Sequence, residues 1–261
     1  MVLPAWPVPV RLRAALRAGL IDQEATMNIA DQPAAGLAVA IQTGDIAEVG
    51  RLLAGYPGLA AEQFTGRGGG TKTALHIVAD WPGYFPGGPQ IVPILIAAGA
   101  DPDARTSGGA PETPLHWAAS SDDADVARAL IDGGADLETP GGSIGTPLDN
   151  AIGYGCWHVA RLLVQRGARV EQLWHAAALG LLDRLEELLA GRPGSEDISH
   201  AFWQACHGGQ RRAAERLLNA GADLSYHPGY ADETPAQIAA THGEQRSNVI
   251  RWLGEQALSR P

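Results

Sequence analysis

The chain has 261 residues, of which 45% are hydrophobic and 18% are charged, so it holds enough apolar side chains for a packed core. Its formal net charge of -10 argues against nucleic-acid binding, which draws its affinity from lysines and arginines on phosphates. The same acidity argues against docking on an anionic membrane surface.

The use of cysteine and lysine indicates a cellular setting. Cys156 and Cys206 lie far apart and outside any Cys-x-x-Cys pair, so no disulfide framework or zinc site is expected. We expect both to be small, buried and unreactive, in a reducing cytoplasmic compartment. Lys72 is the only lysine among 19 basic residues, which together with the many alanines and glycines indicates a high-GC bacterial genome.

Residues 1–32 are expected to form an N-terminal extension, with a capping helix around Arg11 to Leu20 as one possibility. Three prolines interrupt the apolar start of this segment, so it predicts neither a signal peptide nor a membrane span. Met27 is an alternative to Met1 as the natural start, because the main pattern begins soon after it.

Three segments share one pattern: Thr73–Val78 (TALHIV), Thr113–Ala118 (TPLHWA) and Thr146–Ala151 (TPLDNA). Thr113 and Thr146 are 33 residues apart. Threonine caps a helix and proline suits its first turn, while the downstream Gly-Ala pairs at Gly99, Gly134, Gly167 and Gly221 suit the end of a second helix. The pattern resembles the ankyrin signature, which implies an all-α solenoid of helix–turn–helix repeats with short β-hairpin fingers.

This register extends to degenerate units, giving about seven repeats over residues 33–258 and a tail at 259–261. The degenerate units are Ala35–Leu53, Glu171–Leu189, His200–Leu218 and Thr234–Leu253, the last as a C-terminal cap. Trp157, Trp174 and Trp252 stand where the pattern expects core aliphatic residues. We therefore predict that these three tryptophans are part of the core.

The spacing is irregular in two places. Thr73 and Thr113 are 40 residues apart, and most of the excess falls in the turn at 81–89. Thr146 and Glu171 are only 25 residues apart, so the finger after the fourth repeat is predicted to be missing. Irregular repeats are typical of capping units or of a specialised surface.

The glycine-rich run Gly66–Thr73 resembles a phosphate-binding loop only superficially. Thr71 stands directly before the lysine, where glycine is needed, and we expect no strand before the run. A linker or turn is the better prediction.

Other polar residues are predicted to have structural roles. The ankyrin resemblance implies that His76 and His116 hydrogen-bond locally to backbone, and that Asp149 takes the place of the histidine in the fourth repeat. Asp122, Asp123 and Asp125 are predicted to cap a helix. Since no carboxylate or histidine is expected to face them, a metal site is disfavoured, and no cofactor motif appears.

The resemblance implies a concave groove lined by the first helix of each repeat. Aromatic and hydrogen-bonding residues there supply contact area and direction. The candidate partner- or ligand-binding residues, including those of the inserted turn, are Ile77, Asp80, Trp81, Tyr84, Phe85, Trp117, Ser121, Asn150, Tyr154, His175, Gln204 and His207. The competing interpretation is that these large residues only fill an irregular stack.

The function expected from the resemblance is an interaction scaffold that binds a partner protein or peptide, with basic groups favoured by the acidic chain. We expect a monomer. The alternative is a small-molecule-binding or catalytic protein in which Asp80 with His175 or His207 acts as an acid–base pair in the same groove. A third possibility is a structural or immunity-type protein that binds through its convex side or its fingers. No catalytic residue, metal ligand or cofactor is assigned, and an enzyme is the less favoured interpretation.

Overall fold

The computed structural model describes residues 33–65, 69–241 and 247–259. The sequence-based expectations for residues 1–32, including the helix at 11–20 and the start at Met27, lie outside these residues. The described chain divides into two compact units, residues 33–169 (the first unit) and residues 170–259 (the second unit), and each is treated by itself.

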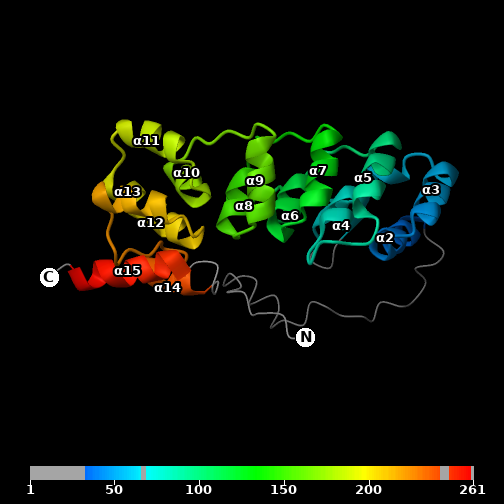
Figure 1. Ribbon diagram of the computed structural model, residues 1–261. Helices are drawn as coiled ribbons and strands as arrows, with labels where there is room; N and C mark the ends of the chain where they lie inside the picture. The colour runs from blue at the N-terminus through cyan, green and yellow to red at the C-terminus, as the bar shows by residue number, and fades with distance from the viewer. Residues whose placement is uncertain (1–32, 66–68, 242–246, 260–261) are drawn as a thin grey trace. The chain divides into compact units, whose positions relative to one another are not determined.

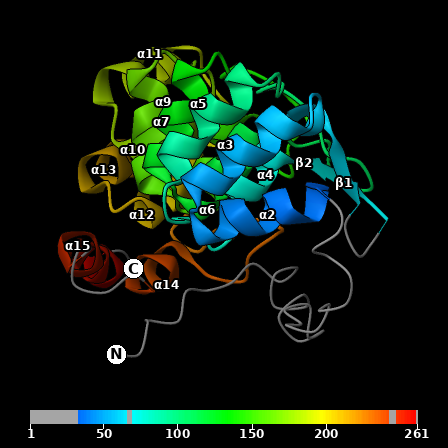
Figure 2. The ribbon, with the colours of Figure 1, turned by 90° about the vertical axis from the view of Figure 1, so that its right-hand side faces the viewer.

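The first unit contains four helix pairs (Figure 1). They are α2 (Pro33–Thr43) with α3 (Ile46–Gly55), α4 (Ala74–Ala79) with α5 (Gly88–Ala97), α6 (Pro114–Ser121) with α7 (Ala124–Asp132), and α8 (Pro147–Gly153) with α9 (Trp157–Gln165). The first helices of the pairs pack on one another in one layer and the second helices in another (Figure 2). A short 3-10 helix at Leu59–Ala61 follows α3.

A β-hairpin connects the first two pairs. Strands β1 (Gln63–Thr65) and β2 (Thr71–Thr73) are antiparallel, with Gln63 opposite Thr73. The expectation that no strand precedes Gly66 is therefore wrong, because β1 ends at Thr65. The described end of the glycine-rich run is strand β2, which pairs antiparallel with β1, and the predicted turn at residues 66–68 lies outside the described residues.

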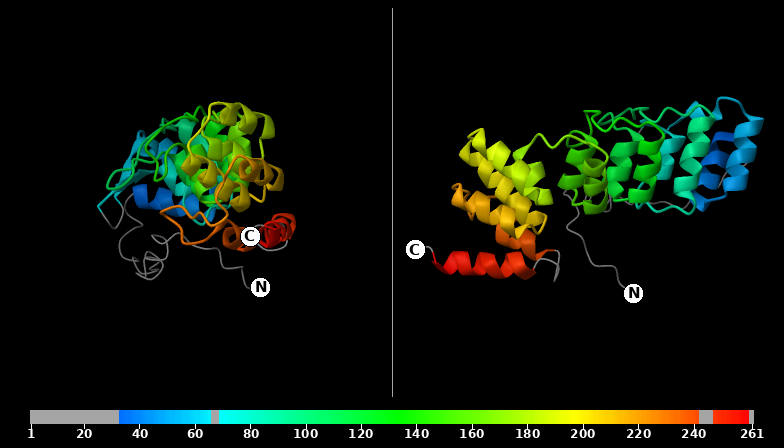
Figure 3. Two further views of the ribbon diagram at one scale, coloured as in Figure 1. Left: turned by 90° about the vertical axis from the view of Figure 1, so that its left-hand side faces the viewer. Right: turned by 45° about the horizontal axis from the view of Figure 1, so that its top comes forward.

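The second unit contains three helix pairs, coloured from yellow to red in Figure 3. They are α10 (Leu173–Leu179) with α11 (Leu182–Ala190), α12 (Ser195–His207) with α13 (Arg211–Asn219), and α14 (Pro235–Ala240) with α15 (Ser247–Ser259). In the described residues the seven expected helix pairs are all present. The all-α ankyrin solenoid predicted from the sequence is thus confirmed.

Small residues let the helices approach closely. The paired alanines Ala118 and Ala119 are fully buried, as is the leucine of the signature, Leu115. In the second unit a Cβ atom on Gly208 would overlap the Ala178 carbonyl, so only glycine permits this approach of α12 to α10. Trp252 is buried as predicted, whereas Trp157 and Trp174 are only half-buried.

The signature histidines connect successive repeats. His76 Nδ1 accepts a hydrogen bond from the Thr73 backbone N–H at 3.1 Å, so the ring proton lies on Nε2, which donates to the Glu112 carbonyl at 3.0 Å. His116 repeats this arrangement with the Thr113 N–H and the Gly145 carbonyl. The predicted local role is confirmed, and each ring also holds the segment before the next repeat.

Two nearly isosteric substitutions separate the two bonds of His116. His116→Asn keeps an acceptor for Thr113 N–H, and His116→Gln keeps a donor for the Gly145 carbonyl. We expect His116→Leu to lower the free energy of unfolding by about 2–4 kcal/mol, and each amide variant to lose roughly half of that. Urea denaturation followed by circular dichroism checks this, and a His116→Asn protein as stable as the parent contradicts a contribution from the bond between repeats.

The buried histidines also predict a pH dependence. Burial lowers the pKa of His76 from 6.5 to about 4 and lowers the pKa of His116 as well. The unfolded chain therefore binds more protons than the folded chain between pH 6.5 and about 4, so His76 destabilises the fold by up to about 3 kcal/mol as the pH falls through this window.

The measurement is the free energy of unfolding of the parent and of His76→Gln from pH 7.5 to about 4. The difference between the two proteins isolates this ring from the many carboxylates. We expect the difference to be constant above pH 6.5 and to shrink below it. A constant difference across the range contradicts the prediction.

Candidate functional site

The inserted loop at 80–87 carries two exposed aromatic side chains. Trp81 is 56% exposed and Tyr84 is 63% exposed. Tyr84 has a backbone φ of 60°, in the left-handed region that residues other than glycine seldom adopt. Backbone strain of this kind persists only where surrounding contacts impose it, and it concentrates at functional positions.

Those contacts come from the next repeat. The Tyr84 N–H donates to Asp123 Oδ2 at 2.6 Å, and the Tyr84 hydroxyl donates to the Asp122 carbonyl at 2.6 Å. Asp123 Oδ1 accepts from the Val126 N–H, so the same carboxylate also caps α7. The exposed Tyr84 is therefore held in place by the carboxylate that caps α7.

Lys72 and Trp117 lie beside this loop. Lys72 Nζ is 2.8 Å from Asp80 Oδ2 and 5.4 Å from the Trp117 ring centre, a cation–π arrangement. Asp80 Oδ1 accepts from the Trp81 N–H at 2.9 Å. The three predicted residues Asp80, Trp81 and Trp117 are thus brought together, with Lys72 added by the β2 strand.

Asn150 serves as a buried connection at the fourth repeat. Its Nδ2 donates to Glu112 Oε1 at 2.9 Å, and its Oδ1 accepts from the Ile144 N–H at 3.0 Å. The Tyr154 hydroxyl lies 2.9 Å from Ser143 Oγ in the same segment. Asn150 therefore positions the segment that Tyr154 contacts and offers no surface of its own.

The acidic run has a partner that the sequence analysis did not foresee. Asp122 Oδ2 is 2.7 Å from His158 Nδ1, so the expectation that no histidine faces this run is wrong. Asp122 Oδ1 accepts from the N–H groups of His158 and Val159 at 3.0 Å, which caps α9 of the next repeat. The predicted capping of α7 is confirmed for Asp123, whereas Asp122 caps α9 instead and Asp125 pairs with Arg128.

In the second unit, the three predicted residues His175, Gln204 and His207 are buried. Gln204 Nε2 donates to the Tyr230 hydroxyl at 3.1 Å, and that hydroxyl lies 2.8 Å from His200 Nε2. Gln204 therefore acts beneath the surface, where it fixes Tyr230.

Several neighbouring aromatic side chains of the second unit were not among the predicted site residues, and Trp174 had been predicted as core. Trp174, His200, Tyr226 and Tyr230 lie next to one another, with ring centres 5.8 Å apart for Trp174 and His200 and 6.0 Å for His200 and Tyr230. The two tyrosines in the finger at 221–234 are the sequence feature that could have indicated this cluster. The ankyrin pattern assigns groove residues only to helix positions, and this finger lies outside them.

Burial divides the predicted residues into two groups. Ile77, Asn150, His175, Gln204 and His207 are buried, whereas Trp81 and Tyr84 are exposed. The half-buried members are Asp80, Phe85, Trp117, Ser121 and Tyr154. The exposed and half-buried members of the first unit are the ones that can touch a partner.

Both cysteines are buried, as expected. Burial raises the pKa of the Cys156 thiol to about 12, so that thiol remains protonated at neutral pH. Within the described residues, no three His, Cys, Asp or Glu side chains gather in a way that could hold a metal ion. None of the described helices combines the length and apolarity needed to cross a bilayer.

The substitution Asp123→Ser tests whether the Asp123 carboxylate holds the loop that carries Tyr84. Asp123→Ser keeps a helix-capping oxygen but cannot bond both Val126 and Tyr84, whereas Asp123→Ala removes both bonds. We expect the serine variant to lose less stability than the alanine variant, which should lose about 1–2 kcal/mol from the cap alone. In both variants, hydrogen exchange of the Tyr84 amide should rise. Unchanged protection of that amide contradicts the proposed anchor.

Comparison with known proteins gives one family match and a structural likeness. Residues 75–172 match the family model described as ankyrin repeats in three copies. The solved ankyrin repeat domain of Bcl-3, a unique member of the IkappaB protein family, shares 26% sequence identity with this chain. The match covers 84% of this chain and 97% of that chain, with a TM-score of 0.49. No curated protein matches in sequence.

The signature segments begin helix pairs in the positions that the pattern predicts. Their histidines make the expected bonds, and the family match covers the three clearest signature segments almost in full. Residues 75–172 of the chain thus match ankyrin repeats in sequence, and their helix pairs have the arrangement that this match implies.

Proposed function

We propose that the first unit binds a partner protein or peptide through the surface formed by Asp80, Trp81, Tyr84 and Trp117, here called the loop surface. Ankyrin repeats are protein-interaction modules, and stacked repeats offer an extended concave surface for binding. The observation that carries the proposal is that Tyr84 is exposed while hydrogen bonds hold both its backbone N–H and its hydroxyl, and that the exposed Trp81 lies three residues before it.

Fixed aromatic residues make efficient binding anchors. A tryptophan or tyrosine buries a large area on binding, and it loses little conformational entropy when it is already held in place. A surface whose only task is to be soluble has no need of exposed rings. The loop surface therefore has the composition of an interaction hot spot.

The charge of the first unit favours a partner with basic groups. Residues 33–169 hold 14 acidic and 8 basic residues, a formal net charge of -6. Opposite charge on a partner raises the association rate and suppresses binding of acidic competitors.

The acid–base alternative finds no support in the geometry. The Asp80 carboxylate is engaged by Lys72 and by the Trp81 N–H. His175 and His207 are buried. The proposed function is therefore the interaction scaffold alone.

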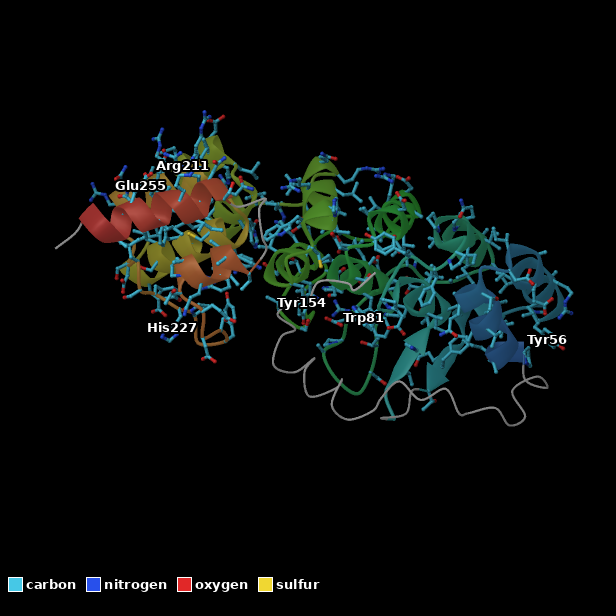
Figure 4. The ribbon with its side chains drawn as sticks, turned by 60° about the horizontal axis from the view of Figure 1, so that its bottom comes forward. Tyr56, Trp81, Tyr154, Arg211, His227 and Glu255 are labelled. Carbon is cyan, nitrogen blue, oxygen red and sulfur yellow. The ribbon has the colours of Figure 1, made fainter. Side chains whose placement is uncertain are left out.

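The test is a peptide selection on the immobilised full chain, followed by affinity measurement of the selected peptides. Trp81→Ala combined with Tyr84→Ala should weaken these peptides by at least about 30-fold, equal to about 2 kcal/mol. The matched control is Tyr56→Ala, since Tyr56 is 49% exposed and lies well away from Trp81 in the first unit (Figure 4).

Two results contradict the proposal. One is a set of peptides that bind the double variant as tightly as the parent, which moves the site elsewhere. The other is an equal loss in Tyr56→Ala, which shows nonspecific binding to exposed aromatics. Thermal denaturation of each variant establishes that the fold is retained.

A further inference from the structure

The second unit carries an aromatic and acidic surface that the loop surface does not include. It is formed by Trp174 on α10, by Glu196, Asp197 and His200 on α12, and by Tyr226 and Tyr230 in the finger at 221–234. We call these six residues the finger patch. Glu196 and His200 are four residues apart and so lie on one face of α12.

The rings of the finger patch surround His200. Its ring centre lies 5.8 Å from that of Trp174, 6.4 Å from that of Tyr226 and 6.0 Å from that of Tyr230. Tyr230 is 62% exposed, and the other three rings are half-buried. The finger thus presents aromatic surface to solvent beside the start of α12.

Hydrogen bonds hold the finger against α12. The Tyr230 hydroxyl accepts from Gln204 Nε2 and lies 2.8 Å from His200 Nε2. Trp203 Nε1 donates to the Glu233 carbonyl at 2.6 Å, and the Asp223 N–H donates to Ser199 Oγ at 3.1 Å. The exposed Tyr230 ring therefore has a fixed position before any ligand arrives.

The charge at the finger patch is negative. Glu196 and Asp197 lie exposed in the first turn of α12. Burial raises the pKa of Tyr226, and the charges of Glu196 and Asp197 raise it further. Burial also lowers the pKa of His200, so this ring is neutral at pH 7 and does not offset the two carboxylates.

Arg211 on α13 lies apart from His227 of the finger. Figure 4 shows Arg211 and His227 at opposite edges of the second unit. Arg211 and Arg216 pair with Glu215 and Glu186 respectively. Both arginines are thus paired with glutamates of α11 and α13.

We propose that the finger patch binds an arginine side chain of a peptide segment from a partner protein. A guanidinium group stacks on aromatic faces and forms paired hydrogen bonds with a carboxylate, and it is more weakly hydrated than an ammonium group. The finger patch has aromatic rings on which a guanidinium group can stack and carboxylates with which it can form hydrogen bonds. This site is separate from the loop surface and does not depend on the proposed function of the first unit.

The probe is a terminally blocked peptide Gly-Arg-Gly-Arg-Gly, titrated into the full chain and followed by NMR of the tryptophan indole N–H signals. The matched probe replaces each arginine with citrulline, which keeps the shape and removes the charge. We expect the Trp174 and Trp203 signals to move with the arginine peptide, and the citrulline peptide to bind at least about tenfold more weakly.

Variants locate the site. Tyr230→Ala and the pair Glu196→Gln/Asp197→Asn should each weaken the arginine peptide by about tenfold. The pair Asp183→Asn/Glu187→Gln removes the same charge from α11 and should leave the affinity unchanged. Trp81→Ala/Tyr84→Ala should also leave it unchanged, so a failure here is distinct from a failure of the loop surface.

Three outcomes overturn the proposal. They are equal binding of the citrulline peptide, unchanged affinity in Glu196→Gln/Asp197→Asn, and movement of the Trp81 and Trp117 signals alone. Tyr230→Phe is the control for disruption of the finger, because it keeps the aromatic ring and removes only the hydroxyl. It should weaken binding less than Tyr230→Ala.

Discussion

The stack of repeats in the first unit depends on the hydrogen bond from each signature histidine to the carbonyl before the next repeat. His76 reaches Glu112 O and His116 reaches Gly145 O, in each case through the nitrogen opposite the one that caps its own helix. Because a single neutral ring serves both purposes, it must stay deprotonated on one nitrogen and protonated on the other. A Cβ atom on Gly142 would overlap the His116 ring, so the neighbouring segment must also leave room for it.

Carboxylates make a second set of connections between repeats. Asp122 caps α9 of the following repeat, and Asp123 holds the Tyr84 amide of the preceding one. Asp103 Oδ1 likewise accepts from the Asp136 N–H, one repeat further on. Many of the acidic residues are therefore bound to backbone N–H groups. The net charge of -10 thus reflects in part how the repeats are joined.

Much of the fold could be predicted from local sequence because each element is determined by nearby residues. The Thr-x-Leu-His segments indicate where helices begin, and the Gly-Ala pairs indicate where they end. The partner of His158 could not be predicted, because Asp122 lies 36 residues earlier in the chain. Asp122 also adopts a left-handed backbone conformation, and no local sequence motif predicts it. Strand β1 was missed for a similar reason, since three residues carry too little pattern to identify a strand.

The candidate site was predicted only in part. The repeat pattern predicts which face of a helix a residue lies on, but it does not predict how deeply the side chain is buried. Asn150 and Gln204 were expected to touch a partner, yet both are buried and donate amide hydrogen bonds to neighbouring segments. In the second unit this amide fixes an exposed tyrosine of the finger. In the first unit a helix-capping carboxylate does the same for Tyr84. In both units a buried polar group holds an aromatic ring at the surface, so substitution of the buried group should weaken binding without removing a single direct contact.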